Sequence, residues 1–244
     1  MKNKLKLKLL VADRQIVRPG DLLAFIEENS QQGFKHFPEK HIYVYNDKVY
    51  SDIVGVVNIV DKDLTVIPLE GTYVPRKDDL VIGVVSSIGI TSWVVDIRAP
   101  YKAILNGSEV IEGFNPIIHN LRDYLDVGDY ILAKIAVFDR SRDPILTIKG
   151  KELGKITEGA VIEVKPSRVP RIIGRKGSML NILTSMTGCN IVVAQNGVLW
   201  IRCKEDESLN ALIEAIKIIN ERPHARGLTE EIRIFLMRKL GKGV

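Results

Sequence analysis

The stretch Ser167–Leu180, "SRVPRIIGRKGSML", places a Gly-x-x-Gly tetrapeptide after an apolar pair and surrounds it with basic residues. Gly174 and Gly177 lack the Cβ atoms that would hold the backbone of a bound molecule away. Arg175 and Lys176, between the two glycines, carry positive charge. A basic surface turn could contain the same four residues, so the elements predicted on either side decide the function of this tetrapeptide.

Residues 155–244 predict a strand, a short helix, the glycine loop, a helix, two strands and a long helix. "GAVIEVK" is typical of a strand, and Asn196-Gly197 within "CNIVVAQNGVLWIRC" is a strong hairpin signal. Ser178 could cap the helix that follows the loop, and Gly188 could end it. "DESLNALIEAIKIINERP" predicts an amphipathic helix, capped by Asp206 or Ser208 and stopped by Pro223, before a last helix in "TEEIRIFLMRKLGKG".

This element order identifies the fold. A Gly-x-x-Gly loop between two helices of a β-α-α-β-β-α unit is typical of the KH domain, which clamps about four nucleotides of single-stranded RNA. The helix after the loop would offer free N–H groups and the positive end of its dipole to a phosphate. The residues expected to contact RNA are Arg171, Ile172, Ile173, Gly174, Arg175, Lys176 and Gly177, with the two isoleucines forming an apolar floor beneath the bases.

The distribution of charge favours a polyanionic partner for the same segment. Residues 1–159 contain 21 Lys and Arg against 22 Asp and Glu, whereas residues 160–244 contain 14 against 8. The whole positive excess of the chain, whose net charge is +5, therefore lies in the last third. A basic patch confined to one domain is most often a footprint for nucleic acid.

Residues 80–150 predict five short strands separated by turns, which fits a small closed barrel of the OB type. Such barrels bind single-stranded nucleic acid with positive charge and stacking aromatic rings. Strand alternation places Trp93 in the core, so Tyr101 is the better aromatic candidate. The predicted RNA-binding residues of this barrel are Arg98, Tyr101, Lys102, Arg140 and Arg142, and Lys134 is a further basic candidate.

Residues 1–75 predict an all-β module. "HIYVYNDKVYSDIVGVVNIVDKDLTVIPL" alternates apolar and polar residues, with turns at Asn46-Asp47 and around Asp61 to Asp63. "MKNKLKLKLL" predicts a half-buried strand rather than a signal peptide, and "VRPGDLLAFI" predicts a turn that opens into another strand. The polar segment Glu27–Phe37 is expected to form a loop. The module contains no cluster of acid, base and nucleophile, which indicates a scaffold or docking role.

We therefore expect a multidomain chain, β-rich and then α+β. Its predicted domains are an N-terminal all-β module (1–75), an OB-type barrel (76–153) and a KH domain with an extra C-terminal helix (154–244). No catalytic residues, metal site or cofactor are predicted, and the chain contains no apolar run long enough to cross a membrane. Cys189 and Cys203 are expected to be reduced, buried thiols in a cytoplasmic protein.

The three-part order resembles a known family. "LVIGVVSSIGITSWVVDI" resembles the start of an S1-type RNA-binding domain, and "RVPRIIGRKGSML" resembles the KH loop that follows it. With "RPGDLLA" near the start, the chain resembles the RNA-binding cap subunits of the archaeal exosome. The resemblance implies three copies on a hexameric ring of RNase-PH-type phosphorolytic subunits. It also implies binding of single-stranded RNA, preferring adenine-rich tails, and delivery of 3′ ends to the subunits that perform 3′-to-5′ degradation.

Three alternatives differ from this reading. A phosphorolytic enzyme would need catalytic domains, for which residues 1–80 leave no room, and the four histidines are scattered. A bacterial-type transcription elongation factor also has an S1-type barrel before KH, but it carries two KH units. A stand-alone S1/KH RNA-binding regulator remains open, and co-purification with RNase-PH-like proteins would distinguish it from a cap subunit.

Overall fold

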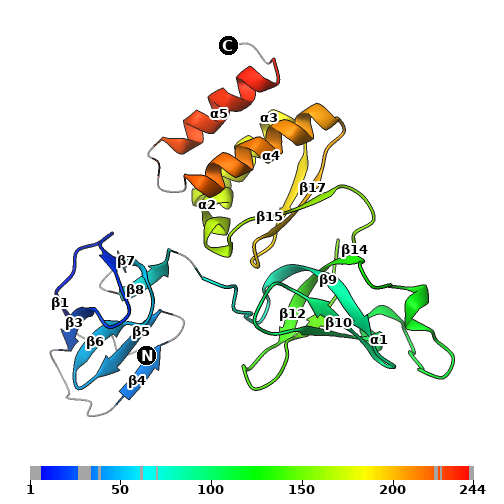
Figure 1. Cartoon of the computed structure of the whole chain (residues 1–244), viewed down its shortest axis with the longest axis horizontal. Helices are drawn as coiled ribbons and strands as arrows, with labels where there is room; N and C mark the ends of the chain where they lie inside the picture. Colours follow the sequence, from blue (N-terminus) through cyan, green and yellow to red (C-terminus); the bar gives the residue numbers. More distant parts are fainter. Residues whose placement is uncertain are drawn as a thin grey trace. The chain divides into compact units, whose positions relative to one another are not determined.

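The chain folds into two compact units, Met1–Gly71 and Thr72–Val244. The computed structural model describes residues 7–26, 34–37, 40–60, 63–69, 71–222, 225 and 227–241. The first unit is all-β, and the second contains a β-barrel followed by an α+β domain, in blue to cyan and in cyan to red in Figure 1. The predicted multidomain fold class is confirmed.

The N-terminal unit consists of two antiparallel sheets around one apolar core. The larger sheet has the strand order β1-β3-β6-β5-β4, and the smaller has the order β2-β7-β8. Val44, Val49 and Leu64 are among the residues of the core between them. The strands are β1 (Leu7–Leu9), β2 (Ile16–Val17), β3 (Leu22–Ile26), β4 (Phe34–Phe37), β5 (Ile42–Tyr45), β6 (Lys48–Ser51), β7 (Gly55–Val60) and β8 (Asp63–Pro68).

The turn predicted at Asn46-Asp47 is confirmed. Asn46 and Asp47 have φ values of 47° and 60°, as a two-residue hairpin turn between β5 and β6 requires. The turn predicted at Asp61 to Asp63 lies mainly outside the described residues, but its strands pair with Val60 opposite Asp63. The loop predicted over Glu27–Phe37 is wrong at its end, because Phe34–Phe37 pairs with β5 as an edge strand. Residues 1–6 and 27–33 lie outside the described part of the chain.

The second unit begins with the predicted five-stranded barrel. Its sheet runs β13-β11-β10-β9-β12, and pairing of β13 with β12 closes it. Trp93 is fully buried in the core, as predicted, and its indole N–H donates a 2.9 Å hydrogen bond to the carbonyl of Leu125. The barrel region comprises β9 (Leu80–Ile88), β10 (Ser92–Asp96), β11 (Ala103–Asn106), α1 (Gly107–Val110), η1 (Leu121–Asp123), β12 (Tyr130–Val137), β13 (Ile145–Thr147) and β14 (Gly154–Lys155). The short β14 pairs antiparallel with β12.

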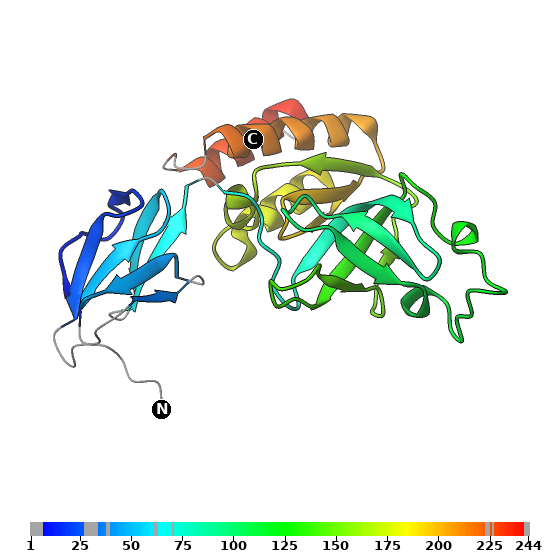
Figure 2. The same ribbon diagram turned by 60° about the horizontal axis from the view of Figure 1, so that its bottom comes forward.

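The last domain has the predicted KH order with an added helix. A three-stranded sheet, β15-β17-β16, has the helices on one side and the barrel on the other, as the two views in Figures 1 and 2 show. The elements are β15 (Ala160–Glu163), η2 (Pro166–Arg168), α2 (Val169–Ile173), η3 (Arg175–Gly177), α3 (Ser178–Thr187), β16 (Asn190–Val193), β17 (Val198–Arg202), α4 (Asp206–Glu221) and α5 (Leu228–Lys239).

Helix ends in this domain differ from the expected caps. Gly177 and Glu205 occupy the N-cap positions of α3 and α4, and neither makes a side-chain cap bond, so capping by Ser178, Asp206 or Ser208 is wrong. Gly188 ends α3 with a φ of 70°, as predicted. Helix α4 ends at Glu221; Pro223, the predicted stop, lies outside the described residues.

The prediction of two free thiols is also wrong. Cys189 precedes β16, Cys203 follows β17, and the two form a disulfide across the open end of this hairpin. The prediction rested on the rarity of disulfides in reducing compartments, which says nothing about distance in the fold. Antiparallel pairing of Asn190 with Arg202 brings the flanking cysteines opposite each other, with their Cα atoms 4.3 Å apart.

Candidate nucleic-acid interface

The Gly-x-x-Gly loop connects α2 to α3 through three residues in left-handed or related backbone conformations. The φ values are 76° at Gly174, 53° at Lys176 and 79° at Gly177. Helix α3 starts directly after this loop and has no side-chain cap. The first N–H groups of a helix have no partner within the helix, so this end is suited to an anion.

The two glycines serve different purposes. A Cβ at Gly174 would lie 2.6 Å from the backbone nitrogen of Met179, so this glycine is required by the chain's own tight entry into α3. A Cβ at Gly177 would meet nothing closer than the Asn181 side chain at 3.9 Å. Only Gly177 therefore leaves open space at the loop surface where another backbone could approach.

The predicted loop residues divide into exposed and structural groups. Arg175 and Lys176 are exposed. Arg171 instead donates a 2.9 Å hydrogen bond from Nη2 to the carbonyl of Ala225, which ties α2 to the segment before α5. Ile172 is completely buried in the domain core, and Ile173 is half-buried. The expected apolar floor can therefore include Ile173 but not Ile172, which supports the loop from within.

A second basic cluster lies on two neighbouring barrel loops. Tyr101 contacts Phe138 edge to face, with ring centroids 4.9 Å apart, and this contact joins the loop before β11 to the loop after β12. Lys102 is exposed on the first loop, and Arg140 and Arg142 are exposed on the second. The structure thus brings together four of the five predicted barrel residues.

Asp139 organises the second of these barrel loops. Its carboxylate accepts hydrogen bonds from the hydroxyl and the backbone N–H of Ser141, at 2.7 and 2.9 Å, and lies 3.6 Å from Nε of Arg142. The hydrogen bonds from Ser141, and then the nearby Arg142 charge, hold the pKa of Asp139 below its ordinary value. The carboxylate is therefore ionised at neutral pH and fixes the turn that exposes Arg140.

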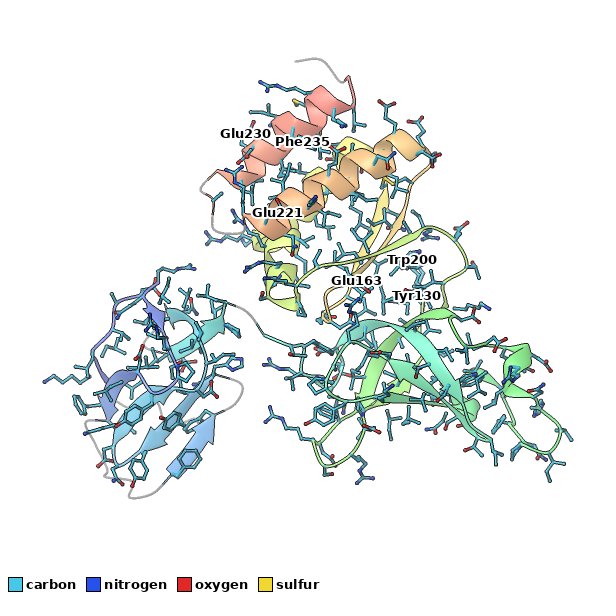
Figure 3. The ribbon with its side chains drawn as sticks, in the orientation of Figure 1. Tyr130, Glu163, Trp200, Glu221, Glu230 and Phe235 are labelled. Atoms are coloured by element: carbon cyan, nitrogen blue, oxygen red, sulfur yellow. A yellow bond between two sulfur atoms is a disulfide. The ribbon has the colours of Figure 1, made fainter. Side chains whose placement is uncertain are left out.

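Arg98, the fifth predicted barrel residue, has a partner within the chain. Its guanidinium pairs with the carboxylate of Glu163 on β15, so it joins the barrel to the KH domain. Figure 3 shows Glu163 at this junction, close to Tyr130 of the barrel and Trp200 of the KH sheet. Lys134 is exposed on β12, opposite Thr147, outside the two basic loops.

The junction between barrel and KH domain is held by Asn196, for which the sequence predicts only a place in a hairpin turn. Asn196, at the tip of the β16–β17 hairpin, is 1% exposed. Its amide nitrogen donates to the carbonyls of Ile82 and Ile97 at 2.7 and 2.9 Å, and its oxygen accepts from the N–H of Ile82 at 3.4 Å. Leu132 of the barrel and Val198 of β17 share an apolar cluster beside it. No local sequence signal distinguishes this asparagine from an exposed one.

Two further properties bear on the chemistry of the chain. Among the described residues, no group of three or more His, Cys, Asp and Glu side chains is placed to hold a metal ion. The helices within the described ranges include none that is long and apolar enough to span a bilayer.

Comparisons with known proteins agree with this architecture. Residues 14–70 match the family model of the exosome RNA binding protein RRP4 N-terminal domain, and residues 159–207 match a KH domain model. The chain is 60% identical over 240 residues to exosome complex component Rrp4 of Thermosphaera aggregans, covering 98% of this chain and 97% of that protein. It is 45% identical over 237 residues to exosome complex component Rrp4 of Saccharolobus solfataricus, covering 96% and 92%.

The chain is also similar in fold to a solved structure. The crystal structure of a candidate exosome complex RNA-binding protein superimposes with a TM-score of 0.67 at 42% identity, covering 70% of this chain and 99% of that one.

Proposed function

Because the chain belongs to the family of exosome complex component Rrp4, we propose that it is an RNA-binding exosome subunit that delivers RNA to other subunits for degradation. The observation that carries this proposal is the exposed pair Arg175 and Lys176 in the KH loop, at the uncapped N-terminus of α3. A cation pair and free N–H groups at one point form a site for the phosphates of a single strand.

The barrel supplies a second set of contacts. Lys102, Arg140 and Arg142 can bind further phosphates, and Tyr101 offers an aromatic ring beside them. Single-stranded nucleic acid is commonly held by this combination of positive charge and stacking. Since the Asn196 hydrogen bonds fix the barrel against the KH sheet, one strand of RNA can contact both sets at a constant spacing.

We assign RNA delivery rather than bond cleavage to this chain. Residues 1–75 dock on a hexameric ring of RNase-PH-type subunits, residues 76–153 and 154–244 bind RNA, and three copies occupy one ring in the cytoplasm. Adenine-rich 3′ tails are the preferred substrate, and phosphorolysis in the 3′-to-5′ direction takes place in the ring. The near full-length similarity to exosome components supports this division of work.

Reconstitution with an RNase-PH-type ring tests the proposal. The chain alone, with phosphate and magnesium, should leave RNA intact. Added to the ring, it should accelerate degradation of long adenine-tailed RNA more than that of very short RNA, because only a long strand reaches both the cap and the active sites. Cleavage of RNA by the pure chain in the absence of the ring would contradict the proposal.

A salt titration provides an independent check on the mode of binding. Each phosphate contact on a single strand contributes about −0.7 to the slope of log affinity against log salt concentration. Contacts from the KH loop and the barrel loops should therefore produce a clearly negative slope. An affinity that does not change between low and moderate salt would exclude binding through these basic residues.

A further inference from the structure

A turn at the start of the barrel presents two cations on a fixed backbone. In this turn the N–H of Arg76 donates to the Asp79 carboxylate at 3.0 Å, and the N–H of Asp79 donates to the carbonyl of Arg76 at 3.2 Å. The Asp79 carboxylate also accepts a 2.7 Å hydrogen bond from the hydroxyl of the buried Tyr73. These bonds anchor the turn, and the side chains of Arg76 and Lys77 are exposed on it.

The turn lies next to the end of strand β12. The N–H of Asp78 donates to the carbonyl of Ile135 at 2.8 Å, and the N–H of Ile135 donates to the carbonyl of Asp79 at 2.9 Å. Strand β12 leads directly into the loop that carries Arg140 and Arg142. The cations of the turn and those of this loop therefore lie at the same end of the barrel.

Lys134 continues this group of cations toward the KH domain. It pairs with Leu80 of β9, and strand alternation places it on the same outer face of β12 as Leu132, which packs in the junction with the KH domain. The carbonyl of Leu80 accepts a 2.9 Å hydrogen bond from the N–H of Gln195 in the turn of the β16–β17 hairpin. Lys134 and Gln195, both exposed, therefore flank Leu80 from the barrel and from the KH domain. The name seam cluster below denotes Arg76, Lys77 and Lys134.

The Gly-x-x-Gly loop lies at the same end of the KH domain as Gln195. Helix α3 begins directly after this loop, spans ten residues and turns at Gly188 into β16, and β16 contacts both α2 and α3. A ten-residue helix is about 15 Å long, close to the length of a strand of five residues, so the start of α3 lies near the end of β16. Both Figure 1 and Figure 2 show α2 and the start of α3, in yellow-green, beside the tip of the hairpin.

The cations of the seam cluster are available to an external anion. Two carboxylates beside the cluster have other partners: Asp79 accepts the bonds described above, and Glu109 accepts the hydroxyl of Thr147, opposite Lys134, and lies 3.4 Å from Nζ of Lys149. Within the described part of the chain, no carboxylate forms an ion pair with the cluster. Its three cations outnumber Asp78, the exposed acid of the turn.

We propose that the seam cluster binds RNA phosphates and guides one strand from the Gly-x-x-Gly loop, past the hairpin turn, to the basic barrel loops. The inference rests on the proposed function, because it requires single-stranded RNA, and it adds a third group of contacts between the two already described. Without the cluster, the KH loop and the barrel would be two sites joined by a stretch of RNA in solvent. With it, the middle of the strand is also held, so affinity should rise until the RNA spans all three groups.

The test compares full-length variants for affinity to a long and a short oligoadenylate. Lys77→Gln with Lys134→Gln removes two charges from the seam cluster, and Lys204→Gln with Lys217→Gln is a control that removes two charges elsewhere. All four lysines are exposed, and neither control lysine has an ion-pair partner among the described residues, so both variants should fold. The long RNA has about 20 nucleotides, enough for a KH site and one OB-type barrel site together, and the short RNA has about four, which a KH loop clamps alone.

For the long RNA, we expect the seam variant to bind at least about fivefold more weakly, with a salt slope less negative by about 1.4 for two lost phosphate contacts. The control should bind the long RNA within about twofold of the unmodified chain. Both variants should bind the short RNA, followed by NMR titration, like the unmodified chain, because the KH loop is intact in both.

The remaining outcomes overturn the assignment. Unchanged affinity of the seam variant for long RNA would show that the strand does not cross the seam, and would leave the proposed function intact. Equal losses in both variants would show dependence on net charge alone, and a loss for the short RNA would place the cluster within the KH-loop site. Weaker binding to the ring with normal RNA affinity would assign the cluster to a protein partner. If the unmodified chain binds no RNA, the proposed function fails, and the inference fails with it.

Chemical modification of lysines in the unmodified chain removes any dependence on the folding of variants. Long RNA should protect Lys77 and Lys134 from an amine-reactive reagent, whereas Lys204 and Lys217 should react equally fast with and without RNA. The short RNA should protect neither pair. Reaction of Lys77 and Lys134 at an unchanged rate under saturating long RNA would reject the seam cluster as part of the RNA path.

Discussion

The side-chain amide of Asn196 donates a 2.9 Å hydrogen bond to the carbonyl oxygen of Ile97, which links the tip of the KH hairpin to the end of barrel strand β10. The two residues are 99 positions apart in the sequence. The same amide also bonds Ile82, so a single buried side chain satisfies backbone groups of two adjacent barrel strands. The barrel and the KH domain are therefore expected to behave as one folding unit.

Replacing Asn196 with alanine should destabilise this unit strongly. The change leaves the carbonyls of Ile82 and Ile97 without their donor in a buried site, and buried unsatisfied groups cost about 1–3 kcal/mol each. We expect a loss of about 2–4 kcal/mol in urea unfolding, with separate transitions for the barrel and the KH domain. Asn220→Ala is the control, because Asn220 makes a single 3.3 Å bond to the backbone of Lys165. Equal stability of both variants would show that the amide does not hold the junction.

The two loop glycines should differ in their tolerance of alanine. Both have positive φ, which costs an L-residue about 1–2 kcal/mol. Gly174→Ala should cost clearly more than this, because its Cβ would lie 2.6 Å from the nitrogen of Met179 and α3 would have to shift. Thermal unfolding of the two variants measures the difference, and equal losses would contradict the close approach of Gly174 to α3.

The fold was predictable where local signals agree. The Asn-Gly pair in the β16–β17 connection, the Gly-x-x-Gly loop and the amphipathic helix α4 each predict one element, and their order defines the KH domain. Strand alternation likewise placed Trp93 in the barrel core correctly. Each of these features depends on residues that are close in sequence, so a local sequence pattern can predict it.

The candidate site was less predictable because its contacts are distant in sequence. Arg98 pairs with Glu163, Arg171 bonds to the carbonyl of Ala225, and Arg142 lies beside Asp139. Three cations predicted to bind RNA therefore have partners within the chain. Ile172 is buried in one core cluster with Met179, Leu183 and Ile191, and the loop sequence alone does not show these contacts. The disulfide is not predictable from the sequence for a similar reason, because only the register of β16 with β17 brings the two cysteines together.

The stability of the barrel should depend on Tyr73 at alkaline pH. Its hydroxyl is buried and donates a 2.7 Å hydrogen bond to Asp79; burial, followed by this bond, raises the pKa of Tyr73 far above its ordinary value. The folded state therefore keeps the proton while the unfolded state loses it near pH 10, so stability is present below pH 10 and falls as the pH rises further. Tyr73→Phe should cost about 1–2 kcal/mol at neutral pH, and its stability should fall less steeply above pH 10. Identical slopes for the two proteins would contradict this role.

Reduction of the Cys189–Cys203 disulfide should lower the stability of the KH domain. The bond closes a loop with a sequence separation of 14, and cross-linking a loop of this size stabilises a fold by about 3 kcal/mol in the chain-entropy model. Thermal unfolding with and without reductant measures the effect. A double variant with Cys189→Ala and Cys203→Ala should unfold at a lower temperature than the oxidised, unmodified chain. Its unfolding temperature should not change when reductant is added. Alkylation of both thiols in unreduced, denatured protein would show that the bond is absent.

The contributions of the KH loop and the barrel to RNA binding can be separated with two charge-matched variants. One variant combines Arg175→Asp with Lys176→Asp, and the other combines Lys102→Glu with Arg142→Glu. Each turns two exposed cations into two anions. Stability should hardly change, because none of the four residues is buried and the N-terminus of α3 partly compensates the new acids beside it.

Both variants should bind single-stranded RNA several-fold more weakly, with a salt slope that is less negative by about 0.7 for each lost phosphate contact. Docking on the ring should be unchanged in both, because the substituted residues lie outside Met1–Gly71. If only the barrel variant loses RNA affinity, the KH loop has the KH fold in this chain but does not bind RNA. A loss confined to the loop variant would make α3 and its cation pair the main site, and the barrel would then serve to hold the KH domain in place through Asn196 and Arg98.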